Sequence, residues 1–443
     1  MRFRVAAATV LLASFLAPAL WAQGLAPVAP ESVGLSTERL ARLEQVIQGY
    51  VDRGQVSGVV SLIARRGGQA HLRAYGMADE ADGRSMETDA IFRIASMTKP
   101  ISSVAVMMLY EEGHFRLNDP VGLYLPELRS LDVLHITDTV NGVFDRVPSE
   151  RPVTIRHLLT HTSGITYRFL GSPAFAPSPA QNLLSGLYAD AGIGDGLAEH
   201  AGTIEDLVTR LGRLPLMHQP GAAFTYGLSV DVLGRLVEVV SGMSYDEFLR
   251  ARIFEPLGME DTYFYLPSDK AGRLASLYAP SPNGVTEQEG TVADRYLTYS
   301  ATYSAGEQRT YFAGGAGLAS TTRDYSRFLQ MILNGGELDG VRILSPITVE
   351  FMTSDHIGDL PSGVVAPGSG GFGLGFAVME SPNVVGDLLG SEGAVYWSGF
   401  FGTGFWIDPR EELLGILMIQ TFPNATDIQD KFRIMTYASI VER

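Results

Sequence analysis

The order of hydrophobic and polar residues predicts strands near both ends of the chain and helices between them. Apolar positions recur with helical spacing over residues 38–53 and 95–112. Two strand-like runs, at 58–64 and 70–75, lie between these helices and are joined by an Arg-Arg-Gly-Gly turn. This part of the chain therefore predicts a helix, a β-hairpin and a second helix.

The middle of the chain has a different pattern from its ends. From residue 117 to about 267 it is mostly helical, with a loop-rich segment at 167–202. Within it, Ser229 is expected to be the N-cap of a helix that runs to about residue 240. Strand-like runs return at 372–379, 404–407 and 413–419, and a last helix is expected at 427–441.

Strands that occur both early and late predict one sheet assembled from the two ends of the chain. We expect an α/β lobe of about residues 30–115 and 300–443. The helical segment of about residues 116–299 then forms an inserted lobe. Functional sites often lie at the junction of two such units, so we expect the reactive residues there.

Composition and the first residues suggest a large exported domain. The 443 residues are 46% hydrophobic and 19% charged, which suits one sizeable core. Residues 1–22 have the pattern of a signal peptide, because Arg2 and Arg4 precede an apolar stretch from Val5 to Trp21, and Ala22 suits a cleavage site. An uncleaved membrane anchor is the alternative, but the short apolar run with Pro18 favours the signal peptide. We expect a periplasmic or secreted bacterial protein, with one domain at 23–443 and no stable membrane insertion after cleavage.

Charge and cysteine content exclude several classes of function. The chain has no cysteine, so disulfides, thiolate metal sites and a cysteine nucleophile are excluded. The formal net charge is −16 at pH 7, and no basic cluster offsets it. Such a surface repels nucleic acid, and we expect no nucleic-acid partner. The composition leaves the oligomeric state open.

Ser96 and Lys99 are the first candidate for chemistry. They are three residues apart at the start of the predicted helix 95–112, so they share one helix face. Desolvation lowers the pKa of a lysine from its free value of ~10.4, and a neutral amine can then take a serine proton. Taken alone, the short motif also fits a surface lysine at a helix start.

Two further segments carry candidate residues. Tyr226 lies on the loop before the predicted helix at Ser229, where a phenol can point into a cleft and relay a proton. Later in the chain, Trp397, Ser398 and Gly399 begin a glycine-rich stretch whose backbone N–H groups can hold an oxyanion. Taken singly, a packed loop tyrosine and a glycine-rich edge strand explain these segments equally well.

In order and character these three segments resemble the serine β-lactamase superfamily, in particular the branch of class C β-lactamases, D-alanyl-D-alanine carboxypeptidases and family VIII carboxylesterases. The resemblance covers nearly the whole mature chain and includes further blocks at residues 92–100, 117–120, 157–164, 255–259 and 314–321. It implies a mixed α and β fold of the β-lactamase/transpeptidase type. We therefore expect an antiparallel sheet flanked by helices, with an inserted helical lobe and a cleft between the two.

The resemblance also implies roles for individual residues. Ser96 matches the acylated nucleophile, Lys99 its base, and Tyr226 the tyrosine that shares proton transfer with the lysine. The oxyanion hole would be the backbone N–H groups of Ser96 and Phe400. The substrate would contact four further positions, Trp397, Ser398, Gly399 and Leu228. No metal or other cofactor is expected, and the partner is a small-molecule substrate.

Two positions depart from the lactamase and peptidase pattern. Leu228 stands where those enzymes usually have an asparagine, and Trp397 stands where they have a cationic residue. A tryptophan cannot recognise the carboxylate of a β-lactam or a peptide. Both departures resemble family VIII carboxylesterases and favour short-chain acyl esters as substrates. A β-lactamase or D-amino-acid peptidase is the alternative enzyme, and a non-catalytic penicillin-binding-like protein is the alternative of another class.

Three other classes of site are rejected: a zinc-protease site, a dinucleotide site and an α/β-hydrolase elbow. His157 and His161 have the spacing of a metal pair but lack the glutamate of a zinc-protease helix, which favours a structural role at a helix end. The G-x-G-x-x-G run at 368–373 is followed by a strand pattern where a dinucleotide site needs a helix. No G-x-S-x-G occurs, against an α/β-hydrolase elbow. Loop aromatics of the segment 167–202 either line the substrate entrance or pack internally, namely Tyr167, Phe169 and Phe175.

Overall fold

The computed structural model describes residues 25–138, 143–305, 309–360, 370–381 and 389–443. The predicted signal peptide and the start of the G-x-G-x-x-G run lie outside these ranges. Within them, no helix has both the length and the apolar character needed to cross a bilayer.

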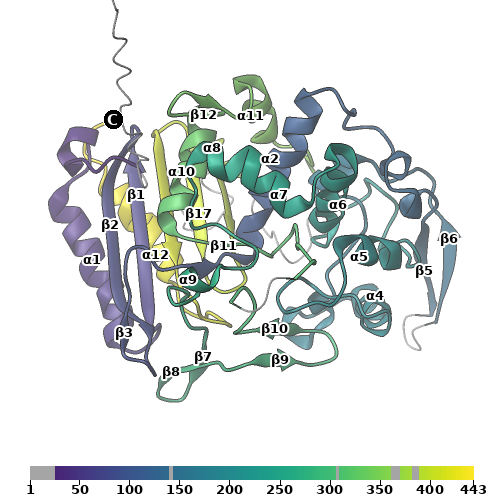
Figure 1. The fold of residues 1–443 in the computed structure, drawn as a ribbon, viewed down its shortest axis with the longest axis horizontal. Coiled ribbons are helices and arrows are strands. Elements are labelled where there is room, and N and C mark those ends of the chain that lie inside the picture. The colour runs from purple at the N-terminus through teal and green to yellow at the C-terminus, as the bar shows by residue number, and fades with distance from the viewer. Residues whose placement is uncertain (1–24, 139–142, 306–308, 361–369, 382–388) are drawn as a thin grey trace, which may run out of the picture.

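An eight-stranded antiparallel sheet joins the two ends of the chain (Figure 1). Strand β1 (Gly58–Arg65) pairs with β18 (Leu413–Met418), with Leu62 opposite Ile416. The strand order is β14-β15-β16-β17-β18-β1-β2-β3. The other strands of this sheet are β2 (Gly68–Asp79), β3 (Arg84–Ser85), β14 (Gly371–Phe372), β15 (Ala377–Val378), β16 (Val395–Ser398) and β17 (Gly404–Asp408).

Both faces of the sheet centre are covered by helices, which is why every residue of β1 is buried. Helices α1 (Thr37–Asp52) and α12 (Ile428–Ala438) pack on one face, in an apolar cluster that includes Ile63 of β1. Helix α10 (Thr322–Leu333) packs on the other face, to which Leu62 points. The alternation of the β1 side chains therefore feeds two separate layers of the core.

The middle of the chain is mainly helical and packs beside the sheet (Figure 1). Helix α2 (Thr98–Glu111) packs against α6 (Ser229–Ser241). The remaining helices are α3 (Ile155–Leu159), α4 (Pro179–Asp190), α5 (Ile204–Leu211), α7 (Tyr245–Leu249), α8 (Glu255–Leu257), α9 (Ser268–Ala271) and α11 (Pro346–Met352). The strands outside the main sheet are β4 (Phe92–Arg93), β5 (Asp132–Asp138), β6 (Val143–Pro148), β7 (Tyr278–Ser281), β8 (Gly284–Glu287), β9 (Thr291–Ala293), β10 (Thr298–Ser300), β11 (Ala319–Ser320), β12 (Glu337–Leu338) and β13 (Val341–Arg342).

The predicted antiparallel sheet flanked by helices is confirmed, but several elements differ from the expectation. The run at 372–379 forms two short strands, β14 and β15, because the backbone turns at Gly375 with a φ of +96°. The mostly helical middle also contains the β5–β6 hairpin, and α4 lies inside the segment expected to be loop-rich. Ser229 begins α6 and is not its N-cap. The lobe limits near residues 115 and 300 stay a prediction.

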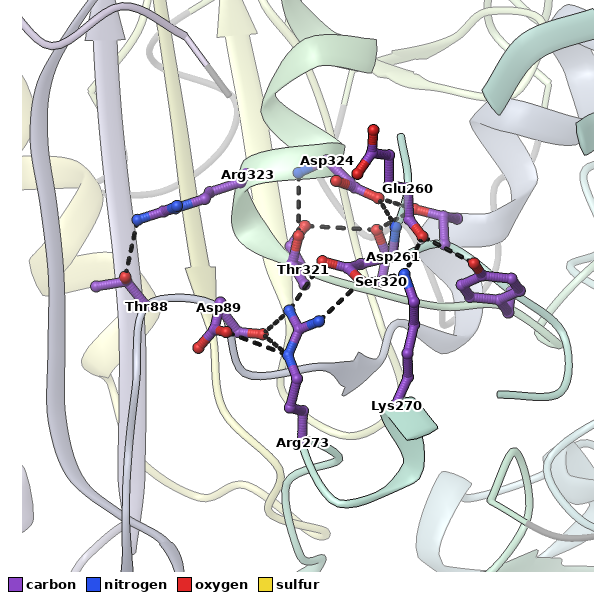
Figure 2. A network of polar contacts seen from close by, with 12 residues as sticks. Thr88, Asp89, Glu260, Asp261, Lys270, Arg273, Ser320, Thr321, Arg323 and Asp324 are labelled. Carbon is purple, nitrogen blue, oxygen red and sulfur yellow. Dashed lines mark hydrogen bonds and ion pairs between the residues drawn. The ribbon is translucent and has the colours of Figure 1, made fainter. Parts of the chain in front are cut away.

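A polar network connects residues 260–273 to the segment that follows β11, the strand paired with β4 just before Ser96 (Figure 2). Arg273 pairs with Asp261 at 2.8 Å, and Lys270 pairs with the same carboxylate at 2.7 Å. The backbone N–H of Asp261 donates to Asp324 at 2.7 Å, and burial raises the pKa of Asp324 to about 7. Asp324 lies in the first turn of α10, directly after β11, which pairs with β4. The network therefore anchors the backbone immediately before the candidate nucleophile.

The centre of the sheet gives the first testable prediction. Leu62 has no exposed surface, so Leu62→Ala should leave a cavity and lower the free energy of unfolding by about 3 kcal/mol. Urea denaturation of the purified protein measures this change. The matched control is Leu123→Ala, at a leucine that is 64% exposed, for which we expect a change within about 0.5 kcal/mol. Equal effects of the two variants would contradict the packing described here.

Candidate active site

Ser96 lies in a tight 3₁₀ turn, Ala95–Met97, between β4 and α2. The preceding residue, Ala95, is fully buried and has a φ of +42°, in the left-handed region that alanine rarely adopts. That backbone costs roughly 1–2 kcal/mol for a residue with a Cβ. Hydrogen bonds on both sides hold it, from Ile94 N–H to Leu318 O and from Met97 N–H to Ile94 O, each 3.0 Å long. The strained turn presents the partly exposed Ser96 side chain at the start of α2.

Lys99 has no exposed surface, and its amine lies against the serine. Its Nζ is 3.0 Å from Ser96 Oγ and donates to the carbonyl oxygen of Gly315 at 2.7 Å. Burial lowers the pKa of Lys99 from 10.5 to about 7, and the negative charge of Asp231 acts against this shift. The amine is therefore available in its neutral form near neutral pH.

Tyr226 contacts the same oxygen from another side. Its hydroxyl donates to Ser96 Oγ at 2.7 Å, so the serine oxygen lies between the phenol and the Lys99 amine. Burial raises the pKa of Tyr226 well above its ordinary value of 10. The phenol is therefore protonated at neutral pH and acts as a donor, while the neutral amine is the better base.

His161 positions the loop that carries Tyr226. Its carbonyl oxygen accepts from Thr225 N–H at 2.7 Å, and its Nδ1 accepts from Gly227 N–H at 3.3 Å. The His161 and Tyr226 rings lie 4.9 Å apart. Gly227 must be a glycine here, because a Cβ would lie 2.1 Å from the carbonyl oxygen of Ile165. Burial lowers the pKa of His161 well below its usual range, so the ring is neutral.

His157, the other histidine of the rejected metal pair, lies at the start of α3. His157 closes a capping box at the start of α3, where its Nδ1 accepts from Thr154 N–H at 3.2 Å. Within the described residues, no group of three or more His, Asp or Glu side chains is placed to hold a metal ion. The two histidines therefore have different structural roles. His157 caps the start of α3, and His161 packs against the Tyr226 ring.

The turn after β16 closely approaches the backbone of Ile94, two residues before Ser96. A Cβ on Gly399 would lie 2.4 Å from the carbonyl oxygen of Ile94 and 2.2 Å from Thr403 Oγ1, so only glycine fits. The next residue is Phe400. Within the described part of the chain, neither the backbone N–H of Ser96 nor that of Phe400 has a hydrogen-bond acceptor. Two free N–H groups on adjoining segments are what an oxyanion hole requires.

Aromatic rings surround these groups. Phe400 stacks on Phe422 with ring centroids 3.9 Å apart and lies 5.6 Å from Phe169. Tyr167 stacks on Phe169 and lies 5.2 Å from the Tyr226 ring. Of the loop aromatics left open above, Tyr167 and Phe169 are thus buried in the packing of the site. Phe175 is partly buried, 5.3 Å from Phe169.

The four expected substrate contacts are not equally placed. Ser398 is exposed, and Gly399 is partly exposed beside it. Trp397 is 9% exposed, with its ring 5.4 Å from that of Tyr226. Leu228 has no exposed surface, so the structure does not bring this side chain to the surface of the site. It lies at the buried entry into α6, and its contact with a substrate stays a prediction.

Asp231 is a site residue that the sequence did not reveal. It lies in the first turn of α6, where acidic residues are common because they favour the positive end of the helix dipole. Here the side chain is fully buried, and its charge acts on Lys99. No local pattern distinguishes such a residue from an ordinary acidic residue at a helix start.

Comparison with known proteins places this geometry in a family. The model of the family described as Beta-lactamase matches residues 43–438. Protein Rv1367c of Mycobacterium tuberculosis H37Rv is 34% identical over 386 residues, which are 85% of this chain and 89% of that protein. Esterase EstB of Burkholderia gladioli is 31% identical over 401 residues, 88% of this chain and 93% of that protein.

The solved structures agree with the sequence relatives. EstCE1, described as a hydrolase with promiscuous acyltransferase activity, superposes with a TM-score of 0.76 at 27% identity. The match covers 90% of this chain and 98% of that one. The expected β-lactamase/transpeptidase-like fold is thereby confirmed. The chain belongs to the β-lactamase family and is a serine hydrolase related to the esterases of that family.

Proposed function

We propose that this protein is a carboxylesterase that cleaves short-chain acyl esters through an acyl-enzyme on Ser96. The observation that carries the proposal is the position of Ser96 Oγ, 3.0 Å from Lys99 Nζ and 2.7 Å from the Tyr226 hydroxyl. A nucleophile between a desolvated amine and a protonated phenol has both a base and an acid within reach. The esterase relatives support the choice of reaction.

The proposed acylation moves one proton around the three side chains. Neutral Lys99 takes the Ser96 proton while Oγ attacks the ester carbonyl carbon. The N–H groups of Ser96 and Phe400 donate to the oxyanion that forms. As the C–O bond to the alcohol breaks, Tyr226 protonates the leaving oxygen, and the Lys99 ammonium returns a proton to Tyr226. In deacylation, water attacks the same carbonyl carbon and gives a proton to neutral Lys99. The bond between that carbon and Ser96 Oγ then breaks, Oγ takes a proton from Tyr226, and the Lys99 ammonium returns a proton to Tyr226, so the carboxylic acid leaves and Ser96 is regenerated.

Substrate choice follows from the groups that the site lacks. Trp397 supplies an indole where a carboxylate-recognising cation would be needed, and Leu228 supplies no amide. The aromatic packing of Phe169, Phe400 and Phe422 suits an apolar, uncharged acyl ester. These features support ester hydrolysis over cleavage of anionic β-lactams or peptides.

We also propose that the enzyme is exported and acts in a bacterial periplasm or outside the cell. The basic and apolar pattern of residues 1–22 and the absence of cysteine support this proposal. Amino-terminal sequencing of the protein from a bacterial host tests it, since cleavage after Ala22 gives a chain that begins at Gln23. An intact Met1 on membrane-bound protein would instead favour the anchor.

Substrate class is tested by a paired hydrolysis assay. Purified protein should hydrolyse short p-nitrophenyl esters much faster than a chromogenic cephalosporin. Ser96→Ala should abolish ester turnover, because it removes the nucleophile. Ser32→Ala, at an exposed serine, is the matched control and should retain full activity. Dominant cephalosporin turnover would show that this enzyme is a β-lactamase despite Trp397 and Leu228.

The pH dependence of ester hydrolysis tests Lys99 as the base. Activity requires the neutral amine, so kcat/KM should rise with pH through about 7 and level off above it. Tyr226 stays protonated throughout, because its pKa is raised above 10. The profile is measured with a neutral ester. Lys99→Arg keeps the charge and cannot lose it, so it should be inactive at every pH; activity with an unchanged profile in this variant would refute the role of Lys99.

The close approach of Gly399 gives a third test. Gly399→Ala should displace the turn that carries Phe400 N–H and lower kcat/KM for esters by about 10²-fold. Gly272→Ala is the matched control, because nothing lies within 4 Å of a Cβ added at that position. Thermal melting of both variants separates a local displacement from unfolding. Wild-type kcat/KM in folded Gly399→Ala would argue against this oxyanion hole.

A further inference from the structure

Asp231 is a carboxylate buried without adequate compensation. It has no exposed surface, and within the described residues neither of its oxygens has a regular hydrogen-bond partner. The backbone N–H of Gly315 faces the carboxylate, but the geometry falls short of a full hydrogen bond. Burial of an incompletely compensated charge lowers stability. A position that accepts such a cost needs an explanation other than packing.

Gly315 connects Asp231 to the Lys99 amine. The carbonyl oxygen of Gly315 accepts from Lys99 Nζ at 2.7 Å, while its N–H faces the Asp231 carboxylate. A Cβ on Gly315 would lie 2.6 Å from Asp231 Oδ2 and 2.5 Å from the Tyr167 hydroxyl, so the absence of a side chain lets the carboxylate approach. Asp231 and Lys99 are both fully buried, so water does not screen the charges from each other.

The other titratable groups around this pair are neutral or separately paired. Asp195 accepts from the backbone N–H of Arg168 at 2.8 Å and lies 3.6 Å from its guanidinium. His161 also faces Lys99, and burial holds its pKa well below the usual range. Burial raises the pKa of each tyrosine that the Asp231 charge reaches, namely Tyr167, Tyr226, Tyr245 and Tyr311. Asp231 is therefore the anion that acts on Lys99.

We propose that Asp231 is a positioning residue whose carboxylate stabilises the ammonium form of Lys99 while Ser96 is deprotonated. The proton passes from Ser96 Oγ to Lys99 Nζ. Burial raises the pKa of Asp231 to about 6, against the charge of Lys99, so the carboxylate is ionised above that pH. The positive charge that develops on Lys99 then lies near a fixed negative charge in a medium of low polarity. The inference rests on the proposed role of Lys99 as base, but it does not depend on which ester is the substrate.

Labelling with a fluorophosphonate tests the proposal without an ester substrate. Ser96 Oγ attacks phosphorus, fluoride leaves, and the serine proton passes to Lys99. In Asp231→Asn the rising limb of the pH–rate profile should shift down by about 1 pH unit, because an opposite charge has been removed near Lys99. The plateau rate should also fall about tenfold or more. Asp195→Asn is the matched control and should show no downward shift.

The outcomes separate this role from a merely structural one. If Asp231 only stabilised the fold, its replacement would lower the fraction of protein that labels but leave the rising limb of the pH–rate profile at the same pH. Labelling rates are therefore normalised to the fraction of protein that is finally labelled. An unshifted limb in Asp231→Asn would overturn the inference. Asp231→Ser, also uncharged, repeats the test if the asparagine variant does not fold. A wild-type protein that labels but hydrolyses no ester would refute the proposed function and leave this test intact.

Direct titration of Lys99 provides a second measurement. The sequence contains three lysines, so NMR of protein with ¹³C at the lysine ε-carbon gives few signals. In a Ser96→Ala background, the Lys99 signal should titrate at a lower pH when Asp231→Asn is added. Lys270 and Lys431 serve as internal controls, because their amines lie beside other carboxylates, 2.7 Å from Asp261 and 3.9 Å from Asp427 respectively. Identical Lys99 titrations with and without Asp231 would also overturn the inference.

Discussion

Lys99 has no exposed surface, and water therefore cannot stabilise its charged form. The chain buries this amine at the start of α2, where it shares a face with Ser96 and lies beneath the Tyr226 ring, 4.5 Å from the ring centroid. The same burial that lowers the pKa of the amine keeps the phenol protonated, because both effects arise from the cost of charge in an apolar interior. One desolvated pocket thus holds the protonated Tyr226 phenol and the Lys99 amine of lowered pKa together.

The sheet determines where the groups around this pocket lie. Its central strands come from opposite ends of the chain, and the turn that joins β16 and β17 brings Gly399 against the carbonyl oxygen of Ile94, two residues before Ser96. Ser96 itself follows β4, which pairs with β11 and is held by the network around Asp324. The strained backbone at Ala95 persists because these neighbours fix it on both sides. Rigid elements therefore position each reactive group, and the reactive turn is not free to relax.

Within the β-lactamase family, this chain places Ser96, Lys99 and Tyr226 together beside aromatic rings. The Ser96, Lys99 and Tyr226 arrangement suits acyl transfer from any carbonyl that reaches it. Discrimination among substrates would then come from the surrounding groups, which among the described residues include the rings of Trp397, Phe400 and Phe422. The likeness to esterases EstB and EstCE1 agrees with that chemistry.

The sequence by itself determined most of the secondary structure at both ends of the chain, and it predicted Ser96, Lys99 and Tyr226 as site residues, which the structure brings within hydrogen-bond distance of one another. These features are local, since a three-residue helical spacing or a strand period is set by neighbours along the chain. Only the tertiary structure decided that Leu228 is buried, that the 372–379 run folds back at Gly375, and that Asp231 lies behind Lys99. Each depends on residues far away in the sequence, and a first-turn aspartate has the same local pattern whether it faces water or a buried amine.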